Sequence, residues 1–175
     1  MTKQKSSFGV LTDIIENEEI KIMAEIGVWK CRLLRKILNK CQDQITQYWA
    51  VDIWEPSNSH RKYQKTTKEQ WDFLYLKACK LMILFPQLHI IKTSSLNASK
   101  LFPPNYLDLV FIDADHRYNS VLSDIKAWLP LIRNNGFLIG HDYWSQHRGV
   151  TEAVDEYFGN DIVIERPFWI KKVVK

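Results

Sequence analysis

The sequence predicts a doubly wound α/β fold, in which helices cover both faces of a mostly parallel β-sheet. Apolar runs of strand length alternate with helical patterns along the chain, at spacings of roughly 20 to 30 residues. These runs are continuously apolar, which is typical of parallel strands buried on both faces. Two short β-like runs near the C-terminus predict an antiparallel hairpin at the edge of the sheet.

The individual elements follow from the same patterns. Apolar runs predict strands at residues 20–28, 47–54, 88–94 and 106–114, and one within 134–143, where a turn precedes the strand. Apolar residues at helical spacing predict helices at residues 8–19, 31–40, 71–85, 121–129 and 150–158. The fourth of these helices is expected to stop or kink at Pro130, because proline cannot continue a helix. Residues 57–64 are expected to form a polar loop, residues 93–99 to hold the loop that follows the third strand, and residues 161–174 to form the closing hairpin.

The composition predicts one folded domain over residues 1–175. The chain has 175 residues, 46% of them hydrophobic and only 6 each of Gly and Pro, which excludes extended disorder. Residues 1–19 are expected as an N-terminal helical extension, and residues 20–172 as the core.

The cysteines and the apolar segments predict a cytoplasmic protein. Cys31, Cys41 and Cys79 have neither a paired framework nor metal-ligand spacing, which fits a reducing compartment. The N-terminus has no apolar region of the secretory type. No segment approaches the roughly 20 apolar residues that span a bilayer, so we expect no membrane partner.

Polar groups follow every predicted parallel strand, at the point where the strand ends. In open α/β sheets ligands bind outside the carboxyl ends of the strands, so these groups are expected to share one cleft. Charged side chains are costly to bury without partners, and this explains why the apolar run before residue 113 ends on carboxylates and an imidazole. The groups are Gly27, Asp52, Ser94 with Ser95, Asp113 with Asp115 and His116, and His141 with Asp142.

The loop after the first strand predicts a nucleoside ligand without a diphosphate. Gly27 lets the backbone approach a ligand, but the further glycines of a dinucleotide fingerprint are missing. Asp52 follows the second strand and suits the two ribose hydroxyls, although an Asp here also caps turns. Ser94 and Ser95 either reach an adenine edge or are ordinary loop serines.

Three stretches resemble class I S-adenosylmethionine-dependent methyltransferases, in the small-molecule branch that carries IDADH and GHDY motifs. AEIGVWKCRLLRKIL resembles the first motif, with Cys31 in place of its second glycine, and YWAVDIWEP resembles the acidic second motif. Residues 107–143, which contain IDADHRY and GHDY, are the most specific part of a resemblance that covers roughly residues 20–172. The family implies a Rossmann-like sheet of seven strands with an antiparallel C-terminal hairpin.

The resemblance also implies where S-adenosylmethionine binds. Gly27 is expected under the methionine portion, with Glu25 near the same loop. Asp52 is expected on the ribose. The remaining contacts implied by the family are Ile53 and Trp54 flanking the adenine, Ser94 and Ser95 near its edge, and Asp113 at the amino-acid end of the cofactor.

The expected reaction is O-methylation of a hydroxyl group on a small molecule. A hydroxyl nucleophile has to lose its proton, and His116 and His141 are candidate bases beside Asp113. By analogy with related enzymes, Asp113 and Asp142 are candidate ligands for Mg²⁺, which prefers oxygen donors. The alternatives are that both carboxylates hydrogen-bond the backbone and that His116 only holds its loop. His60 and His147 are expected at the surface or at the fringe of the substrate pocket.

The charge pattern bears on the substrate. The net charge is +4, and residues 60–80 hold six Lys and Arg against two acids. This stretch is either a solvated helix face or a patch for an anionic ligand. The basic residues of 57–67 favour an anionic or sugar-like substrate; we expect no nucleic-acid partner, and a homo-oligomer is left open. The rival functions are a nicotinamide-dependent oxidoreductase and a non-catalytic or degenerate cofactor-binding module.

Overall fold

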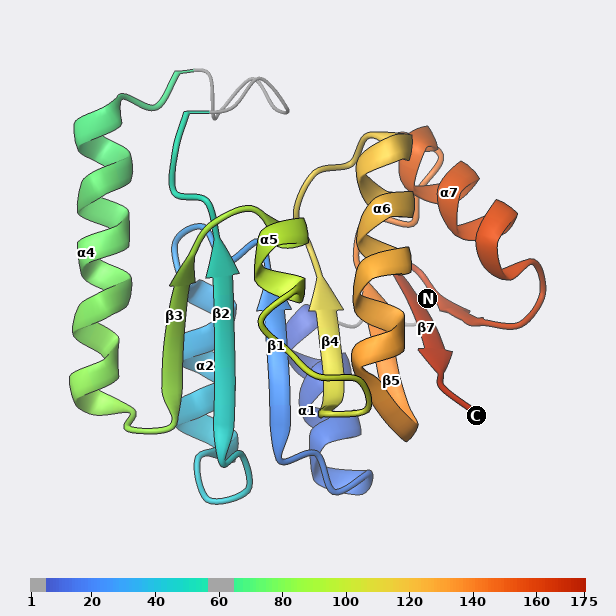
Figure 1. Ribbon diagram of the computed structural model, residues 1–175, viewed down its shortest axis with the longest axis horizontal. Helices are drawn as coiled ribbons and strands as arrows, with labels where there is room; N and C mark the ends of the chain where they lie inside the picture. Colours follow the sequence, from blue (N-terminus) through green and yellow to red (C-terminus); the bar gives the residue numbers. More distant parts are fainter. Residues whose placement is uncertain (1–5, 57–64) are drawn as a thin grey trace.

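The computed structural model describes residues 6–56 and 65–175, which form one seven-stranded sheet in the order β3-β2-β1-β4-β5-β7-β6 (Figure 1). The first five strands are parallel, β7 runs antiparallel to β5, and β6 antiparallel to β7. The predicted doubly wound sheet with its C-terminal hairpin is therefore confirmed. The strands are β1 (Ile22–Ile26), β2 (Gln47–Asp52), β3 (Leu88–Lys92), β4 (Leu107–Ile112), β5 (Ile132–Gly140), β6 (Val163–Glu165) and β7 (Phe168–Lys172).

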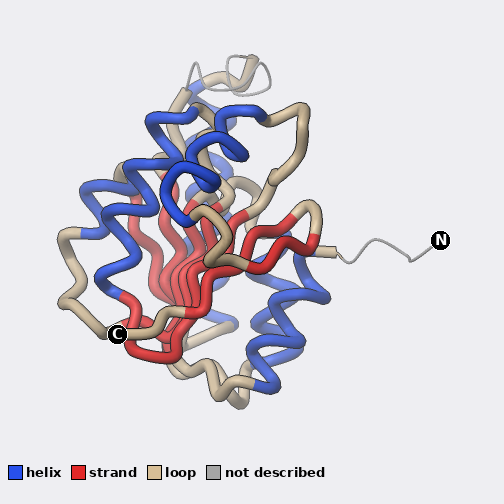
Figure 2. Tube along the Cα trace, turned by 90° about the vertical axis from the view of Figure 1, so that its right-hand side faces the viewer, coloured by secondary structure: helices blue, strands red, loops and turns tan. Residues whose placement is uncertain are grey.

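Helices cover both faces of the sheet, as Figure 2 shows from the side. One layer holds α1 (Ser7–Asn17), α2 (Arg32–Cys41) and α4 (Lys68–Leu84). The other holds α5 (Ser95–Ser99), α6 (Tyr118–Trp128) and α7 (Arg148–Phe158). The expected stop at Pro130 is confirmed, because α6 ends at Trp128 and passes into the 3-10 turn Leu129–Leu131.

The continuous apolar strands supply two separate cores. Side chains alternate across a strand, so Met23 packs into the layer of α1 and α2, whereas Ala24 and Ile26 pack into the layer of α6 and α7. Both faces of β1 and β4 are buried, which explains why their sequences do not alternate in polarity.

Two local predictions were wrong. Residues 95–99 form the short helix α5 instead of a loop, and Ser94 caps it by accepting a hydrogen bond from the amide of Asn97. The turn expected at 134–136 is an irregularity within β5, which already begins at Ile132. Asn135 has a φ of +60°, and the pairing of β5 with β4 shifts there, so the strand continues through the polar residues.

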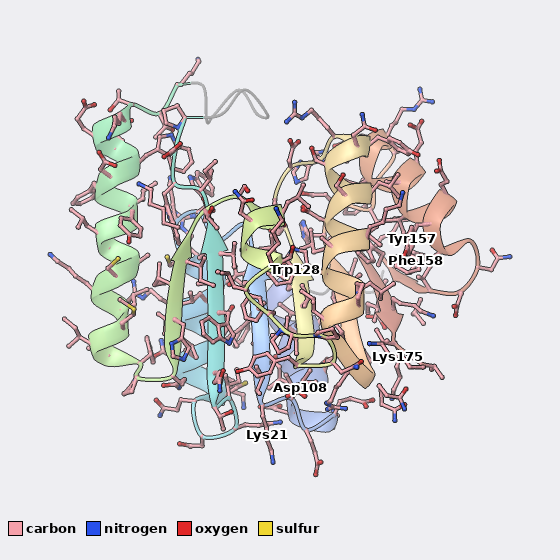
Figure 3. All side chains as sticks on the ribbon, in the orientation of Figure 1. Lys21, Asp108, Trp128, Tyr157, Phe158 and Lys175 are labelled. Atoms are coloured by element: carbon pink, nitrogen blue, oxygen red, sulfur yellow. The ribbon has the colours of Figure 1, made fainter. Side chains whose placement is uncertain are left out.

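A buried carboxylate joins the strands at the end opposite their carboxyl termini. Asp108 of β4 accepts hydrogen bonds from the backbone amides of Lys21 and Ile22, both at 2.7 Å, and pairs with Arg133 of β5. Figure 3 labels Lys21 and Asp108 at this lower edge of the sheet. These contacts tie β1, β4 and β5 together away from the cleft described below.

Candidate active site

The carboxyl ends of the parallel strands meet along one edge of the sheet, to which the arrowheads of β1–β4 point in Figure 1. Two cavities open at this edge, one of about 500 Å³ and one of about 310 Å³. Both are lined by Gly27, Trp29 and Asp113, so they adjoin as two compartments of one cleft. The cleft lies where strand order reverses between β1 and β4, the place expected for a ligand in this kind of sheet.

Gly27 begins the loop between β1 and α2. It allows this loop to lie close to the end of β2 on one side and to the backbone after β4 on the other. Its amide donates to the carbonyl of Val51 at 2.9 Å, and its φ is +93°. A Cβ atom at this position would lie 2.1 Å from the carbonyl oxygen of Asp113. Both the backbone angle and the contact therefore require glycine.

The rest of this loop turns tightly without further glycines. Trp29 and Cys31 have φ values of +46° and +56°, in the left-handed region that glycine normally occupies. Cys31 precedes α2, is buried, and has a pKa that burial raises to about 12, so its thiol stays neutral. The backbone at Cys31 thus adopts a conformation typical of glycine, at the position where this sequence lacks the second glycine of the first motif.

Asp52, at the end of β2, lines the larger cavity and is held in place by the same loop. One carboxylate oxygen accepts from the amide of Trp29 and the other from the amide of Trp54, both at 2.8 Å. Burial raises the pKa of Asp52, and these backbone hydrogen bonds oppose that shift. Each oxygen keeps acceptor capacity for a ligand hydroxyl.

Ile53 and Trp54, both expected beside an adenine, point in different directions. Ile53 lines the larger cavity and is 44% exposed. Trp54 is fully buried, donates from Nε1 to the carbonyl of Trp29 at 3.0 Å and packs against Tyr75. Trp54 is not among the described residues that line the larger cavity. Trp54 therefore supports the loop after β1 through its hydrogen bond to Trp29.

The far wall of the larger cavity comes from the start of α5 and from α6. Ser94 and Ser95 line it, and Ser95 Oγ accepts a hydrogen bond from Trp128 Nε1 at 2.8 Å. Asp124 lines the same wall, is only 5% exposed and interacts with Ser95. Burial raises the pKa of Asp124 to about 6.

Asp113 and Asp115, two residues apart after β4, have different surroundings. The amide of Asp113 donates to Ile26, which fixes its position at the junction of the two cavities. The carboxylate of Asp115 accepts hydrogen bonds from Arg117 and Ser120 and thereby organises the start of α6. The carboxylate of Asp113 instead faces His116, whose Nε2 lies 3.8 Å from it.

Glu25 forms the floor of the smaller cavity. It is 3% exposed and accepts a hydrogen bond from the buried hydroxyl of Tyr48. Burial raises the pKa of Glu25 to about 8, so the side chain is largely neutral at pH 7.

Imidazoles and carboxylates gather at one end of the smaller cavity. His116 Nε2 lies 2.9 Å from an oxygen of Asp142 and 3.8 Å from one of Asp113. His141 Nδ1 lies 3.1 Å from Asp142, and His147 Nε2 lies 3.8 Å from it. These residues come from the loops after β4 and β5 and from the start of α7, and we call them the His/Asp cluster.

The cluster shifts the pKa values of its members. The neighbouring carboxylates of Asp113 and Asp142 raise the pKa of His116 to about 9. Burial acts to raise the pKa of Asp142, but the facing imidazoles outweigh it and hold this pKa below its ordinary value. Perturbed groups that share a cleft are typical of functional sites.

Comparison with known proteins identifies the family. Residues 24–143, more than half of the chain, match the family model described as a methyltransferase domain. The chain belongs to this methyltransferase family. The match begins within β1 and ends just after β5, so it includes the loops after β1 to β4 and the start of the loop after β5.

Two solved methyltransferase structures share the fold. The O-methyltransferase NovP has 18% identity over 94% of this chain and 76% of its own, with a TM-score of 0.64. The TDP-rhamnose 3′-O-methyltransferase of calicheamicin biosynthesis has 13% identity over 95% and 77%, with a TM-score of 0.65. An uncharacterized protein of Acanthamoeba polyphaga mimivirus is 35% identical over 40 residues, and this match spans 23% of our chain and 18% of that protein.

The methyltransferase cleft contains most of the residues expected from the sequence and one, Asp124, that was not. It brings Gly27, Asp52, Ile53, Ser94, Ser95 and Asp113 to the larger cavity, and Glu25, His116, His141 and Asp142 to the smaller one. Asp124 was missed, although it lies on the helix face of Val121, Ile125 and Trp128, where a carboxylate is unusual. His147 was expected at the surface or the pocket fringe and lies in the His/Asp cluster.

Part of the basic stretch cannot be placed in the methyltransferase. Residues 57–64, including Arg61 and Lys62, lie outside the described residues, and Lys65 is exposed. Among the described helices, none combines the length and the apolar character needed to cross a bilayer.

Proposed function

We propose that the protein is an S-adenosylmethionine-dependent methyltransferase that methylates a hydroxyl group of a small molecule. The family match and the class I fold imply the cofactor. The observation that carries the proposal is the pair of adjoining cavities that share Gly27 and Asp113. The larger cavity suits the nucleoside of the cofactor, and the smaller cavity contains groups that can accept a proton. The methyl group would therefore be transferred where the two cavities adjoin.

The nucleoside would occupy the larger cavity. Asp52 offers two fixed oxygens to the ribose hydroxyls, and Ile53 offers an apolar surface to the adenine. Ser94 and Ser95 would lie near the edge of the base. Trp54 is buried, so we assign it the role of supporting the loop and not that of flanking the base.

The methionine portion would pass Gly27 into the smaller cavity. The absence of a Cβ atom at Gly27 leaves room between β1 and the loop after β4. Asp113 faces this cavity, where its carboxylate suits the ammonium group of the cofactor, and the largely neutral Glu25 lies at the floor of the same cavity.

Methyl transfer from a sulfonium is an in-line displacement, to which the enzyme mainly contributes alignment. Fixing the two reactants can lower the barrier by roughly 7–11 kcal/mol at best. The acceptor hydroxyl also has to lose its proton as its oxygen bonds to the methyl carbon and the carbon–sulfur bond breaks. His141 lines the smaller cavity and is the proposed base, with Asp113 nearby, whereas His116, with a pKa of about 9, already holds a proton at neutral pH.

The donor set does not suit the Mg²⁺ ion expected on Asp113 and Asp142. Mg²⁺ prefers oxygen ligands in octahedral geometry. Here imidazole nitrogens approach Asp142 at 2.9 Å and 3.1 Å, and they outnumber the carboxylates of the His/Asp cluster. We therefore derive no catalytic step through Mg²⁺.

The acceptor is proposed to be anionic or sugar-like. Lys30 and Arg32 line the smaller cavity and provide positive charge next to the proposed reaction centre. One structural neighbour is described as acting on TDP-rhamnose, which is both a sugar and an anion. A nucleic-acid partner is not part of the proposal, and the oligomeric state and the cytoplasmic location remain predictions.

Calorimetric titration with S-adenosylhomocysteine and, separately, with NAD tests the cofactor assignment. We expect binding of S-adenosylhomocysteine alone, because the loop after Gly27 lacks the bare backbone that a pyrophosphate needs. Binding of NAD alone would support the oxidoreductase alternative.

The reaction itself is tested by mass-spectrometric detection of methyl transfer from S-adenosylmethionine to a panel of sugar nucleotides, phosphorylated sugars and phenols. We expect a methylated product, and we expect the H141Q variant to lose it, because His141 is the proposed base. Cofactor binding without transfer to any acceptor would favour the non-catalytic module.

A further inference from the structure

The start of α7 is packed unusually close to the loop between β4 and α6. Gly149 lies in the first turn of α7, and a Cβ atom there would be 2.5 Å from the carbonyl oxygen of His116 and 2.7 Å from the amide nitrogen of Tyr118. This contact joins two segments that are about thirty residues apart in the chain. It brings His147, the residue that precedes α7, next to His116.

Two imidazoles and one carboxylate converge at this contact. The rings of His116 and His147 meet edge to face with centroids 4.7 Å apart. His116 Nε2 lies 2.9 Å from one oxygen of Asp142, and His147 Nε2 lies 3.8 Å from the other. One donor atom from each of the three residues falls within 4.8 Å of the other two, which is close enough for all three to reach one ion.

The buried nitrogen of His116 is not satisfied by a hydrogen bond. His116 Nε2 is inaccessible to solvent and makes no hydrogen bond among the described residues, although a carboxylate oxygen of Asp142 lies 2.9 Å away. A buried polar atom without a partner is costly, so its position calls for a ligand or an ion.

We propose that His116, Asp142 and His147 form a binding site for a divalent transition ion of the Zn²⁺ type. Two imidazoles with one carboxylate are a ligand set used by zinc and by iron(II), and they disfavour Mg²⁺. A tetrahedral ion held by three side chains keeps a fourth position for water or an acceptor oxygen. Asp113 and His141 are not members of this set, so His141 is the base that remains for the acceptor hydroxyl.

The test titrates chelator-treated protein with Co²⁺, followed by its visible absorption, and with Zn²⁺ and Mg²⁺ by calorimetry. We expect one Zn²⁺ per chain, bound at least about tenfold more tightly than Mg²⁺. Absence of Zn²⁺ binding, or equal affinity for Mg²⁺, overturns the proposal. No cofactor is present in this assay, so its outcome is independent of the proposed methyl transfer.

Variants separate the proposed ligands from their neighbours. H147A removes a ligand and should lose at least roughly 10- to 100-fold in Zn²⁺ affinity, because loss of even an outer-shell partner costs that much. D113N removes only a neighbour of His116 and should lose less than H147A, and H89N, which removes an imidazole on β3, should bind Zn²⁺ within a few-fold of wild type. Unchanged affinity in H147A, or a larger loss in D113N than in H147A, overturns the assignment of ligands.

A second variant tests the packing that assembles the site. G149A changes none of the three ligand residues but forces α7, and with it His147, away from His116. We expect weaker Zn²⁺ binding from a variant whose circular dichroism spectrum is still native. Native-like affinity in folded G149A contradicts the argument from packing, and if G149A does not fold, H147A decides.

Discussion

Single residues determine whether the cleft can form at all, and the loop after β1 is the clearest case. Gly27 has a φ of +93° and faces the backbone of Asp113, so no larger residue fits. Trp29 and Cys31 adopt left-handed backbone conformations, which cost residues other than glycine roughly 1–3 kcal/mol. The hydrogen bond from Trp29 to Asp52 opposes this strain and couples the loop to the proposed ribose site.

Replacing Gly27 by alanine should lower the free energy of unfolding by about 1–3 kcal/mol or more, from backbone strain plus the clash with Asp113. It should also abolish binding of S-adenosylhomocysteine. Chemical denaturation and calorimetry measure the two effects. The matched control is G9A within α1, where a Cβ atom meets nothing closer than 3.6 Å. A G27A protein as stable as G9A would refute this reading.

Glu25 should make stability depend on pH. Its pKa is about 8 in the folded protein and 4.5 when unperturbed, so the folded state binds more protons than the unfolded state between these values. The free energy of unfolding should therefore fall as pH rises through this window, by up to about 1.4 kcal/mol per pH unit from this group. Above about pH 8 its contribution to the slope should vanish.

Urea denaturation at several pH values measures this slope. E25Q should remove it, because an amide can still accept the hydrogen bond from Tyr48 but does not titrate. D43N changes an exposed carboxylate and should leave the slope as in wild type. The interpretation fails if wild type and E25Q have the same dependence on pH.

At the scale of elements, the strands are joined at the edge opposite the cleft by Asp108. Asp108 is 8% exposed, and its carboxylate accepts hydrogen bonds from two backbone amides of the segment that begins β1 and pairs with Arg133 of β5. Figure 3 shows that this link lies far from the carboxyl ends of β1–β4. Stability and cofactor binding should therefore be separable.

D108A should lower the free energy of unfolding by about 2–3 kcal/mol, because it leaves buried amides and Arg133 without a charged partner. Affinity for S-adenosylhomocysteine should stay within a few-fold of wild type. D161A is the control: it removes a salt bridge from a carboxylate that is 79% exposed, so stability should change by less than about 1 kcal/mol. If D108A matches D161A in stability, Asp108 is not the link described above.

Elements were predictable where one local pattern dominated. The buried runs of β1 and β4 and the helical spacing of α4 and α7 each indicated a single structure. Helix α5 was missed because its 5 residues are too few to display a period. The continuation of β5 through Asn134 and Asn135 was missed because pairing with β4 outweighs the local preference of these residues for turns.

At the scale of the whole molecule, the topology assembles the cleft from loops that are distant in the chain. The rule that ligands bind at the carboxyl ends of parallel strands was enough to bring Gly27, Asp52 and Asp113 together from the sequence. It did not give side-chain directions within the loops. Trp54 has a φ of +42°, which turns the backbone after β2 and sends the ring into the core instead of toward the cavity.

The contacts of His147 with His116 and Asp142 could not be predicted from the sequence for a different reason. Its neighbours His116 and Asp142 are set by the packing of α7 against α6, which depends on contacts such as that of Gly149. No local pattern encodes such a contact. Asp124, in contrast, left a local signal as the carboxylate on the buried face of α6.

The most direct measurement is the affinity of S-adenosylhomocysteine for wild type, D52A and the exposed control D43A, by calorimetry on proteins whose thermal unfolding shows that they are folded. Loss of hydrogen bonds to a charged acceptor is worth about 1.5–3 kcal/mol, so D52A should bind roughly 10- to 150-fold more weakly than wild type and D43A equally well. Failure of wild type to bind the ligand, or equal binding by D52A, would contradict the assignment of a nucleoside held by Asp52.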